Sequence, residues 1–225
     1  MEEKIKECLK LQEELNLKIN QNWRLDRKEE DFYRAIWLEC AESMESLPWK
    51  WWKKMETDLE NLEIEVADIF HFILSISLLK NDADLRYFKK AINSDFSNLE
   101  GIEGDYLNHY LADVYMRDKV DTYIFLIERV AEKSLRRDYN GTLFFFGLLV
   151  KELFDFNKLY LLYFGKNILN HIRQEMGYKT GDYKKVINGM EDNRYLIKLI
   201  QEIEDKNQLE AKIRELFESL TKEVN

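Results

Sequence analysis

Proline and glycine are scarce in this chain, and that scarcity constrains the fold more than any other sequence feature. Pro48 is the single proline, and no glycine precedes Gly101. A strand-rich protein needs turn-forming residues about every ten positions. Apolar residues also recur at helical spacing in the first and last segments, so the pattern favours long helices throughout.

We therefore predict an all-α fold, a helical bundle within one domain over residues 1–225. A first glycine-bearing connection at 97–106 is a candidate boundary between two lobes, and 175–193 lack helical periodicity. A turn followed by a short aromatic helix is expected over 46–55. Helices are expected at 3–19, 31–46, 60–80, 82–96, 105–116, 119–136, 141–164, 166–175, 193–203 and 207–222.

Composition excludes several classes of function. The chain is 45% hydrophobic and 13% aromatic, which suffices for a sizeable core. Its net charge of −9 argues against a surface that coats a nucleic acid polymer. Cys8 and Cys40 have no framework spacing, and the charged N-terminus is unlike a signal peptide. No apolar run reaches the ~18 residues of a membrane span, so we expect a reduced cytoplasmic protein.

Two pairs of acidic residues occur on successive expected helices. Glu39 and Glu42 lie one turn apart, and so do Glu65 and Asp68, which interrupt an apolar run. One such pair alone is usually solvated, but two matched pairs argue against that interpretation. Buried like charges need an offset, either from arginines or from a hard cation such as Mg²⁺, which prefers oxygen ligands. Glu45 is interpreted as an exposed bystander.

His71 and Phe72 follow the second acidic pair. A lone histidine on a helix more often makes a structural hydrogen bond than binds a metal, and Mg²⁺ rarely takes imidazole. Phe72 is by default a core residue, although an aromatic ring beside a metal site could also stack on a nucleobase.

Cations and amides gather in a second region, 165–185. This segment suits a phosphate chain, although a solvated basic surface is the simpler interpretation when it is taken alone. Inward-facing amides need partners, and a ligand is one possibility. The cations are Lys166, Arg173, Lys179, Lys184 and Lys185, and the amides are Asn167, Asn170 and Gln174, with Gln12, Asn16, Asn20 and Asn22 in and after the first helix.

Several stretches together carry a resemblance to a known family. They are LKLQEELN (9–16), ECAESMES (39–46), WKWWKK (49–54), EIEVADIFHFILS (63–75) and YFGKNILNHIRQEMGYKTGDYKKVINGMEDN (163–193). The chain resembles the dimeric all-α dUTPases (dUTP diphosphatases) of the kinetoplastid and Campylobacter kind, in the all-α NTP pyrophosphatase superfamily. The acid pattern indicates only the superfamily, whereas WKWW and the last stretch indicate the dUTPase branch. Residues 82–140 carry no matching motif.

The resemblance implies Mg²⁺-dependent hydrolysis of dUTP, and also of dUDP, to dUMP. It implies a homodimer with a rigid and a mobile lobe, in which segment 165–193 closes on the nucleotide. Metal-binding and catalytic roles fall on Glu39, Glu42, Glu65 and Asp68, with Glu39 orienting or deprotonating the attacking water. Positions near uracil and deoxyribose are Gln12, Asn16, Asn20, Trp51, His71, Phe72 and Asn170, and positions near the phosphates are Lys166, Arg173, Tyr178 and Lys179.

Two alternatives remain open from the sequence. The first is a MazG-like NTP pyrophosphatase with other or broader nucleotide specificity. The second is a helical interaction protein whose acidic residues are simply solvated, which would neither respond to Mg²⁺ nor hydrolyse nucleotides.

Overall fold

The computed structural model describes residues 1–95, 118–203 and 205–222, and this part of the chain is almost entirely helical. The all-α prediction is confirmed. The helix expected at 105–116 and the candidate boundary at 97–106 lie outside the described residues. The helices are α1 (Glu2–Ile19), α2 (Trp23–Asp26), α3 (Glu29–Glu45), α4 (Leu59–Lys80), α5 (Arg86–Ile92), α7 (Lys119–Leu135), α8 (Tyr139–Leu153), α9 (Phe156–Glu175), α10 (Asp192–Glu202) and α11 (Lys206–Lys222).

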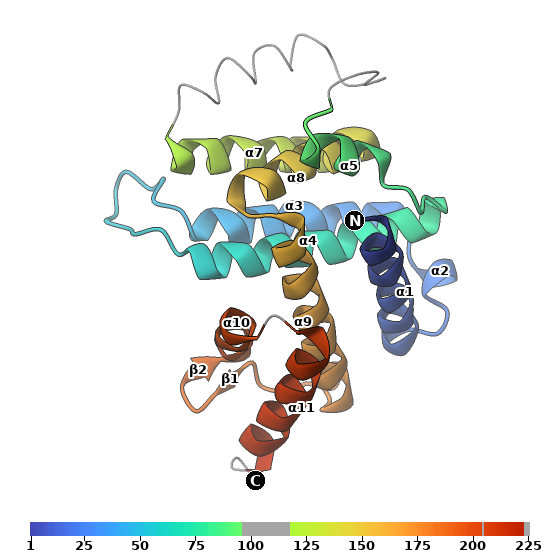
Figure 1. Ribbon diagram of the computed structural model, residues 1–225, viewed down its shortest axis with the longest axis vertical. Coiled ribbons are helices and arrows are strands. Elements are labelled where there is room, and N and C mark those ends of the chain that lie inside the picture. The colour runs from blue at the N-terminus through green and yellow to red at the C-terminus, as the bar shows by residue number, and fades with distance from the viewer. Residues whose placement is uncertain (96–117, 204, 223–225) are drawn as a thin grey trace.

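Helices α3 and α4 lie side by side across the middle of the molecule (Figure 1). Helices α5, α7 and α8 form a layer on one side of this pair. Helix α9 leads away from that layer to the opposite end, where α10 and α11 pack against it, and α1 and α2 lie beside the α3–α4 pair. None of the described helices is long and apolar enough to cross a membrane.

Two hydrophobic cores hold these helices together. The larger core joins α1, α3, α4, α5, α7, α8 and the first part of α9. At its centre the rings of Phe70, Phe88 and Phe146 stack on one another with centroids 5.7 to 5.8 Å apart. The smaller core joins the rest of α9 to α10, α11 and residues Ile64 and Ala67 of α4. Helices α4 and α9 therefore contribute to both cores.

The break between α8 and α9 differs from the prediction of helices at 141–164 and 166–175. Helix α8 ends at Leu153, and α9 begins after Asp155, whose side chain accepts a hydrogen bond from the Lys158 backbone N–H. An N-cap of this kind starts a helix strongly. The prediction places a helix boundary at Gly165, but Gly165 lies inside α9, where its missing side chain lets Leu196 of α10 approach.

Three further segments also differ from the prediction. The expected aromatic helix within 46–55 is wrong, because 46–58 form a loop of turns closed by a hydrogen bond from Asp58 N to Ser46 O. The helix expected at 82–96 starts only at Arg86, because Asp82 accepts from the backbone N–H groups of residues 84 and 85. Helix α2 was not predicted.

A short hairpin follows α9 and was not predicted either. Strand β1 (Val186–Ile187) pairs antiparallel with β2 (Met190–Glu191) around Asn188 and Gly189. Both turn residues have positive φ, 50° and 79°, as a two-residue hairpin turn requires. This hairpin delivers the chain to the start of α10.

Gly147 is expected to be essential for the packing of α8 on α5. A Cβ at Gly147 would lie 2.8 Å from the Phe88 carbonyl oxygen, which belongs to the backbone. Gly147→Ala should lower the free energy of unfolding by about 1–3 kcal/mol, as overpacking of a core does. Equilibrium urea unfolding measures this change.

Gly165→Ala is the matched control, since Gly165 also lies inside a helix. Its Cβ would meet the side-chain ends of Leu196, Ile200 and Ile213, at 2.9, 3.1 and 3.5 Å, and these can move. Helix propensity favours alanine by about 1 kcal/mol at both sites. We expect the control to stay within about 1 kcal/mol of the wild type. Equal losses in both variants would contradict the backbone-contact argument.

Candidate functional site

A cleft of 690 Å³ opens between α1, α3, α4 and α9 and extends to the start of α10. Its walls are unusually rich in charged and amide side chains. The predicted site residues that line it are Gln12, Asn16, Asn20, Glu39, Glu42, Glu65, Asp68, His71, Phe72, Lys166, Asn170, Arg173 and Tyr178.

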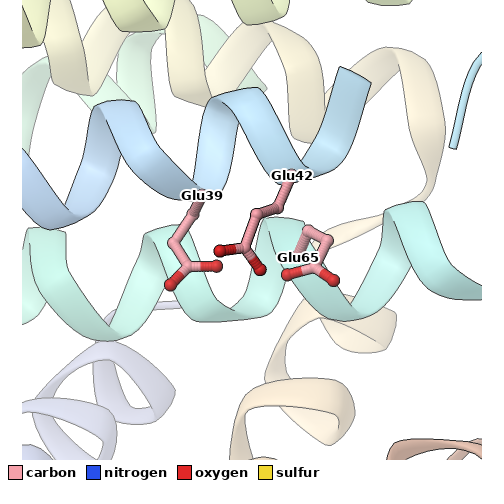
Figure 2. A group of neighbouring side chains, drawn as sticks. All are labelled: Glu39, Glu42 and Glu65. Atoms are coloured by element: carbon pink, nitrogen blue, oxygen red, sulfur yellow. The ribbon is translucent and has the colours of Figure 1, made fainter. Parts of the chain in front are cut away.

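Three carboxylates converge on one wall of the cleft. Glu39 and Glu42 extend from α3 toward α4, where Glu65 meets them (Figure 2). Each offers an oxygen, and these oxygens all lie within 4.8 Å of one another. The helical spacing of the first pair and the packing of α3 on α4 together produce this cluster.

Burial and mutual repulsion disturb the titration of this cluster. Burial raises the pKa of Glu39, and the charges of Asp68, Glu65 and Glu42 raise it further. Burial also raises the pKa of Glu65, with a contribution from Asp68 that Lys166 partly offsets. Like charges this close favour the protonated form unless a cation neutralises them. An all-oxygen donor set of this kind fits a hard divalent cation such as Mg²⁺.

Asp68 stands apart from the three-glutamate cluster. Its Oδ2 lies 2.8 Å from Nζ of Lys166, a side chain on α9 that is 2% exposed. Lys166 also donates to Asn193 Oδ1 at 2.8 Å. The structure thus places the fourth predicted acid between the glutamates and the cations of the opposite wall.

Amides and an imidazole form a connected network at the α1 end of the cleft. Gln12 Nε2 donates to Asn16 Oδ1 at 3.0 Å, which turns Gln12 Oε1 toward Nδ1 of His71, 2.7 Å away. Tyr163 donates to the same Oε1 at 3.2 Å. Asn16 Nδ2 in turn donates to Ser75 Oγ at 3.1 Å.

This network fixes the tautomer of His71. Since Gln12 Oε1 is an acceptor, Nδ1 carries the proton, and Nε2 is left as a buried acceptor with no partner among the described residues. Burial lowers the pKa of His71 to about 3, so the ring is neutral. The imidazole therefore carries a buried acceptor beside the cleft, which suits an N–H or O–H of a ligand.

Arg173 and its partners form the wall near the start of α10. Arg173 pairs with Asp192 through Nε and Nη2, both at 2.8 Å. Its Nη2 also donates to Asn193 Oδ1 at 3.1 Å, and its Nη1 to Asn170 Oδ1 at 3.2 Å. Tyr183 donates to Asp192 Oδ2 at 2.8 Å.

The remaining predicted residues lie elsewhere. Trp51 is 90% exposed in the 46–58 loop and is not among the residues that line the cleft. Lys179 is exposed as well and donates to the Ile19 carbonyl at 3.4 Å. Of Asn20 and Asn22, only Asn20 lines the cleft. Glu45 is exposed as expected and pairs with Lys50, yet it also lines the cleft.

A comparison with protein families shows the family of the chain. A family model described as dUTPase matches residues 4–178, from α1 to just beyond the end of α9. The chain belongs to the dUTPase family. This dUTPase is a dUTP diphosphatase, a hydrolase that acts on dUTP. No curated protein sequence matches the chain.

The matched segment carries the glutamate cluster, His71, Lys166 and Arg173, whereas the hairpin, α10 and α11 follow it. The residues of this dUTPase that sequence reasoning missed include Arg27, Asn61, Ser75 and Asn193, which line the cleft, and Asp192, which pairs with Arg173. Asn61 precedes Glu65 by one turn and shares its helix face, a spacing that could have indicated it. The adjacent Asp192 and Asn193 start α10, where short polar residues are common, so they gave no signal.

In the absence of metal, the free energy of unfolding of the dUTPase is expected to fall as pH rises from about 5 to about 9. The native pKa values, about 7 for Glu65 and about 9 for Glu39, lie above the usual 4.5. The native state therefore binds these protons more tightly than the unfolded chain. This stabilisation is complete below the unfolded pKa and is lost as pH rises through the native values. Urea unfolding in chelator measures it.

Two variants and added Mg²⁺ test the assignment to the glutamate cluster. Glu39→Gln should flatten the pH dependence, whereas Glu45→Gln should preserve it, because Glu45 is exposed and already paired with Lys50. Added Mg²⁺ should reduce the pH dependence of the unfolding free energy in the wild type, since the cation takes the place of the protons. An unchanged slope in Glu39→Gln would contradict the assignment.

Proposed function

We propose that this dUTPase hydrolyses dUTP, and also dUDP, to dUMP in a Mg²⁺-dependent reaction. The observation that carries the proposal is the presence of acids and cations in one cleft. Glu39, Glu42 and Glu65 converge from α3 and α4, and Lys166 and Arg173 extend from α9. A polyphosphate needs both a site for its metal ion and cations for its remaining oxygens.

In this proposal the glutamate cluster holds the cation, with Asp68 at its edge. When bound, Mg²⁺ neutralises phosphate charge and lowers the pKa of a coordinated water. Glu39 then orients the attacking water and takes its proton. Its position beside Glu42 and Glu65 supports this role, because a carboxylate next to the metal can accept a proton from a metal-bound water. Lys166 and Arg173 stabilise the negative charge that the phosphate chain develops as the bond breaks.

The α1 end of the cleft is proposed to bind the base and sugar. The unpartnered Nε2 of His71 can accept the imino N–H of uracil, which cytosine lacks at the same ring position. Gln12 and Asn16 hold the imidazole and line the same end. Phe72, half-buried and also lining the cleft, offers a ring face to the base.

The resemblance adds expectations about the whole enzyme. We propose one domain over 1–225 that acts as a cytoplasmic homodimer, with segment 165–193 closing on the nucleotide. Tyr178, which lines the cleft within this segment, supports the closing role, and exposed Trp51 and Lys179 would join the site only on closure or assembly.

Pyrophosphate release from the eight common nucleoside triphosphates, with Mg²⁺ and with chelator, tests the proposed function. We expect pyrophosphate release from dUTP when Mg²⁺ is present, and none in chelator. Glu65→Gln should reduce it by about a hundredfold or more, since a lost metal ligand removes several kcal/mol of charge stabilisation. Glu63→Gln removes the same charge from the same helix, but Glu63 pairs with Lys158 and should be dispensable. Comparable hydrolysis of dCTP or dTTP would instead indicate a broader, MazG-like enzyme.

His71→Phe is expected to reduce the preference for dUTP over dCTP. The preference, taken as the ratio of kcat/KM values, should fall by about tenfold, because one hydrogen bond to the base is lost. Tyr163→Phe is the control, since it removes a hydroxyl from the same network but leaves the His71–Gln12 hydrogen bond. If His71→Phe prefers dUTP over dCTP as strongly as the wild type does, other residues recognise the base.

A further inference from the structure

Arg173 and Asp192 form a buried ion pair outside the glutamate cluster. Their side chains are 7% and 1% exposed, and two parallel hydrogen bonds of 2.8 Å join them. A buried pair of this kind is weak as a source of stability, because desolvation of both charges offsets most of the attraction. Apolar residues of similar size would hold α9 to α10 as well, so the pair calls for another explanation.

The geometry of the pair determines which end of the guanidinium is free to act. Asp192 occupies Nε and one position of Nη2. The remaining Nη1 and Nη2 donors contact Asn170 and Asn193, and both of these side chains line the cleft. The guanidinium thus turns its open end toward the cleft and its paired edge away from it.

Asn193 marks a position for an anionic oxygen at this open end. Its Oδ1 accepts from Lys166 Nζ at 2.8 Å and from Arg173 Nη2 at 3.1 Å. One oxygen between two cations is the arrangement that a phosphate oxygen favours. The carboxamide oxygen has only a partial charge, so a phosphate oxygen can replace it with a gain in electrostatic attraction.

Asp192 is itself held firmly in place. Tyr183 donates to its Oδ2 and the Asn193 backbone N–H to its Oδ1, both at 2.8 Å. Its own backbone N–H donates to Lys185 O at 2.8 Å. The hairpin and the first turn of α10 therefore fix the carboxylate on which the orientation of Arg173 depends.

We propose that Asp192 is a positioning residue that holds Arg173 with its Nη1–Nη2 end toward the phosphate chain of the nucleotide. The inference rests on the function proposed above, which assigns Arg173 to the phosphates. Asp192 acts through Arg173 alone and touches no reacting atom. Segments after residue 178, beyond the matched family region, thereby contribute to nucleotide binding.

Calorimetric binding of two non-reacting ligands tests this role. One is the α,β-imido analogue of dUTP in Mg²⁺, and the other is deoxyuridine, which has no phosphate. Asp192→Asn should raise the Kd of the analogue by about tenfold, the value of one charge-assisted hydrogen bond, and leave that of deoxyuridine within about twofold. If Asp192 were merely structural, Asp192→Asn would raise the Kd values of both ligands by the same factor. That result would overturn the proposal.

A double-mutant cycle with Arg173→Gln isolates the pathway of the effect. If Asp192 acts through Arg173, the double variant binds the analogue no more weakly than Arg173→Gln alone. Additive losses would overturn the proposal. Arg194→Gln is the matched control, because Arg194 follows on the same helix but pairs with Asp58 and Glu60 outside the cleft. It should change neither affinity.

Two further arms separate the possible failures. If Asp192→Asn does not fold, Tyr183→Phe is used in its place. This variant keeps the ion pair but removes one hydrogen bond to the carboxylate, and it should raise the Kd of the analogue by about threefold. An unchanged affinity there overturns the proposal. A wild type that binds the analogue but fails to hydrolyse dUTP refutes the proposed function and leaves the positioning role standing. A wild type that does not bind the analogue refutes both.

Discussion

Repulsion among Glu39, Glu42 and Glu65 is the constraint on which the arrangement of this molecule depends. Left to themselves, these carboxylates would separate, since like charges near buried surfaces cost several kcal/mol. The helices cannot separate, because α3 and α4 bury Ile36, Val66 and their neighbours on the faces turned away from the cleft. Each such side chain contributes roughly 1.5–3 kcal/mol. The large core thus forces the acids together and, on the proposed function, gives them an affinity for a cation.

The site lies where it does because α4 and α9 belong to both cores. Asp68 and His71 follow one face of α4, and Lys166 and Arg173 lie two turns apart on α9. Each of these side chains projects from a helix that is packed at both ends, so its position is set by the cores and not by a loop. Rigid elements place functional groups more accurately than loops do.

Helical character and most of the cleft could be predicted from the sequence, because both depend on short-range spacing. Acids three apart must share a helix face, and the cation- and amide-rich segment 165–185 supplies Lys166, Asn170 and Arg173 to the cleft. The predictions that are wrong depend on contacts between residues distant in sequence. Gly165 was read as a break, yet its space is filled by Leu196 of α10. The Asn188-Gly189 turn was a local signal that helical reasoning overlooked.

The pairings of the cations could not be predicted at all, and they explain how metal and nucleotide would bind together. Lys166 is engaged by Asp68 and Asn193, so its charge has partners within the chain. On the proposed function, a cation beside Asp68 competes with Lys166 for that carboxylate and frees the ammonium for phosphate. Each ligand then lowers the cost of binding the other, which is a coupling between sites in the thermodynamic sense. On that function, the cleft would favour the metal–nucleotide complex over either component alone.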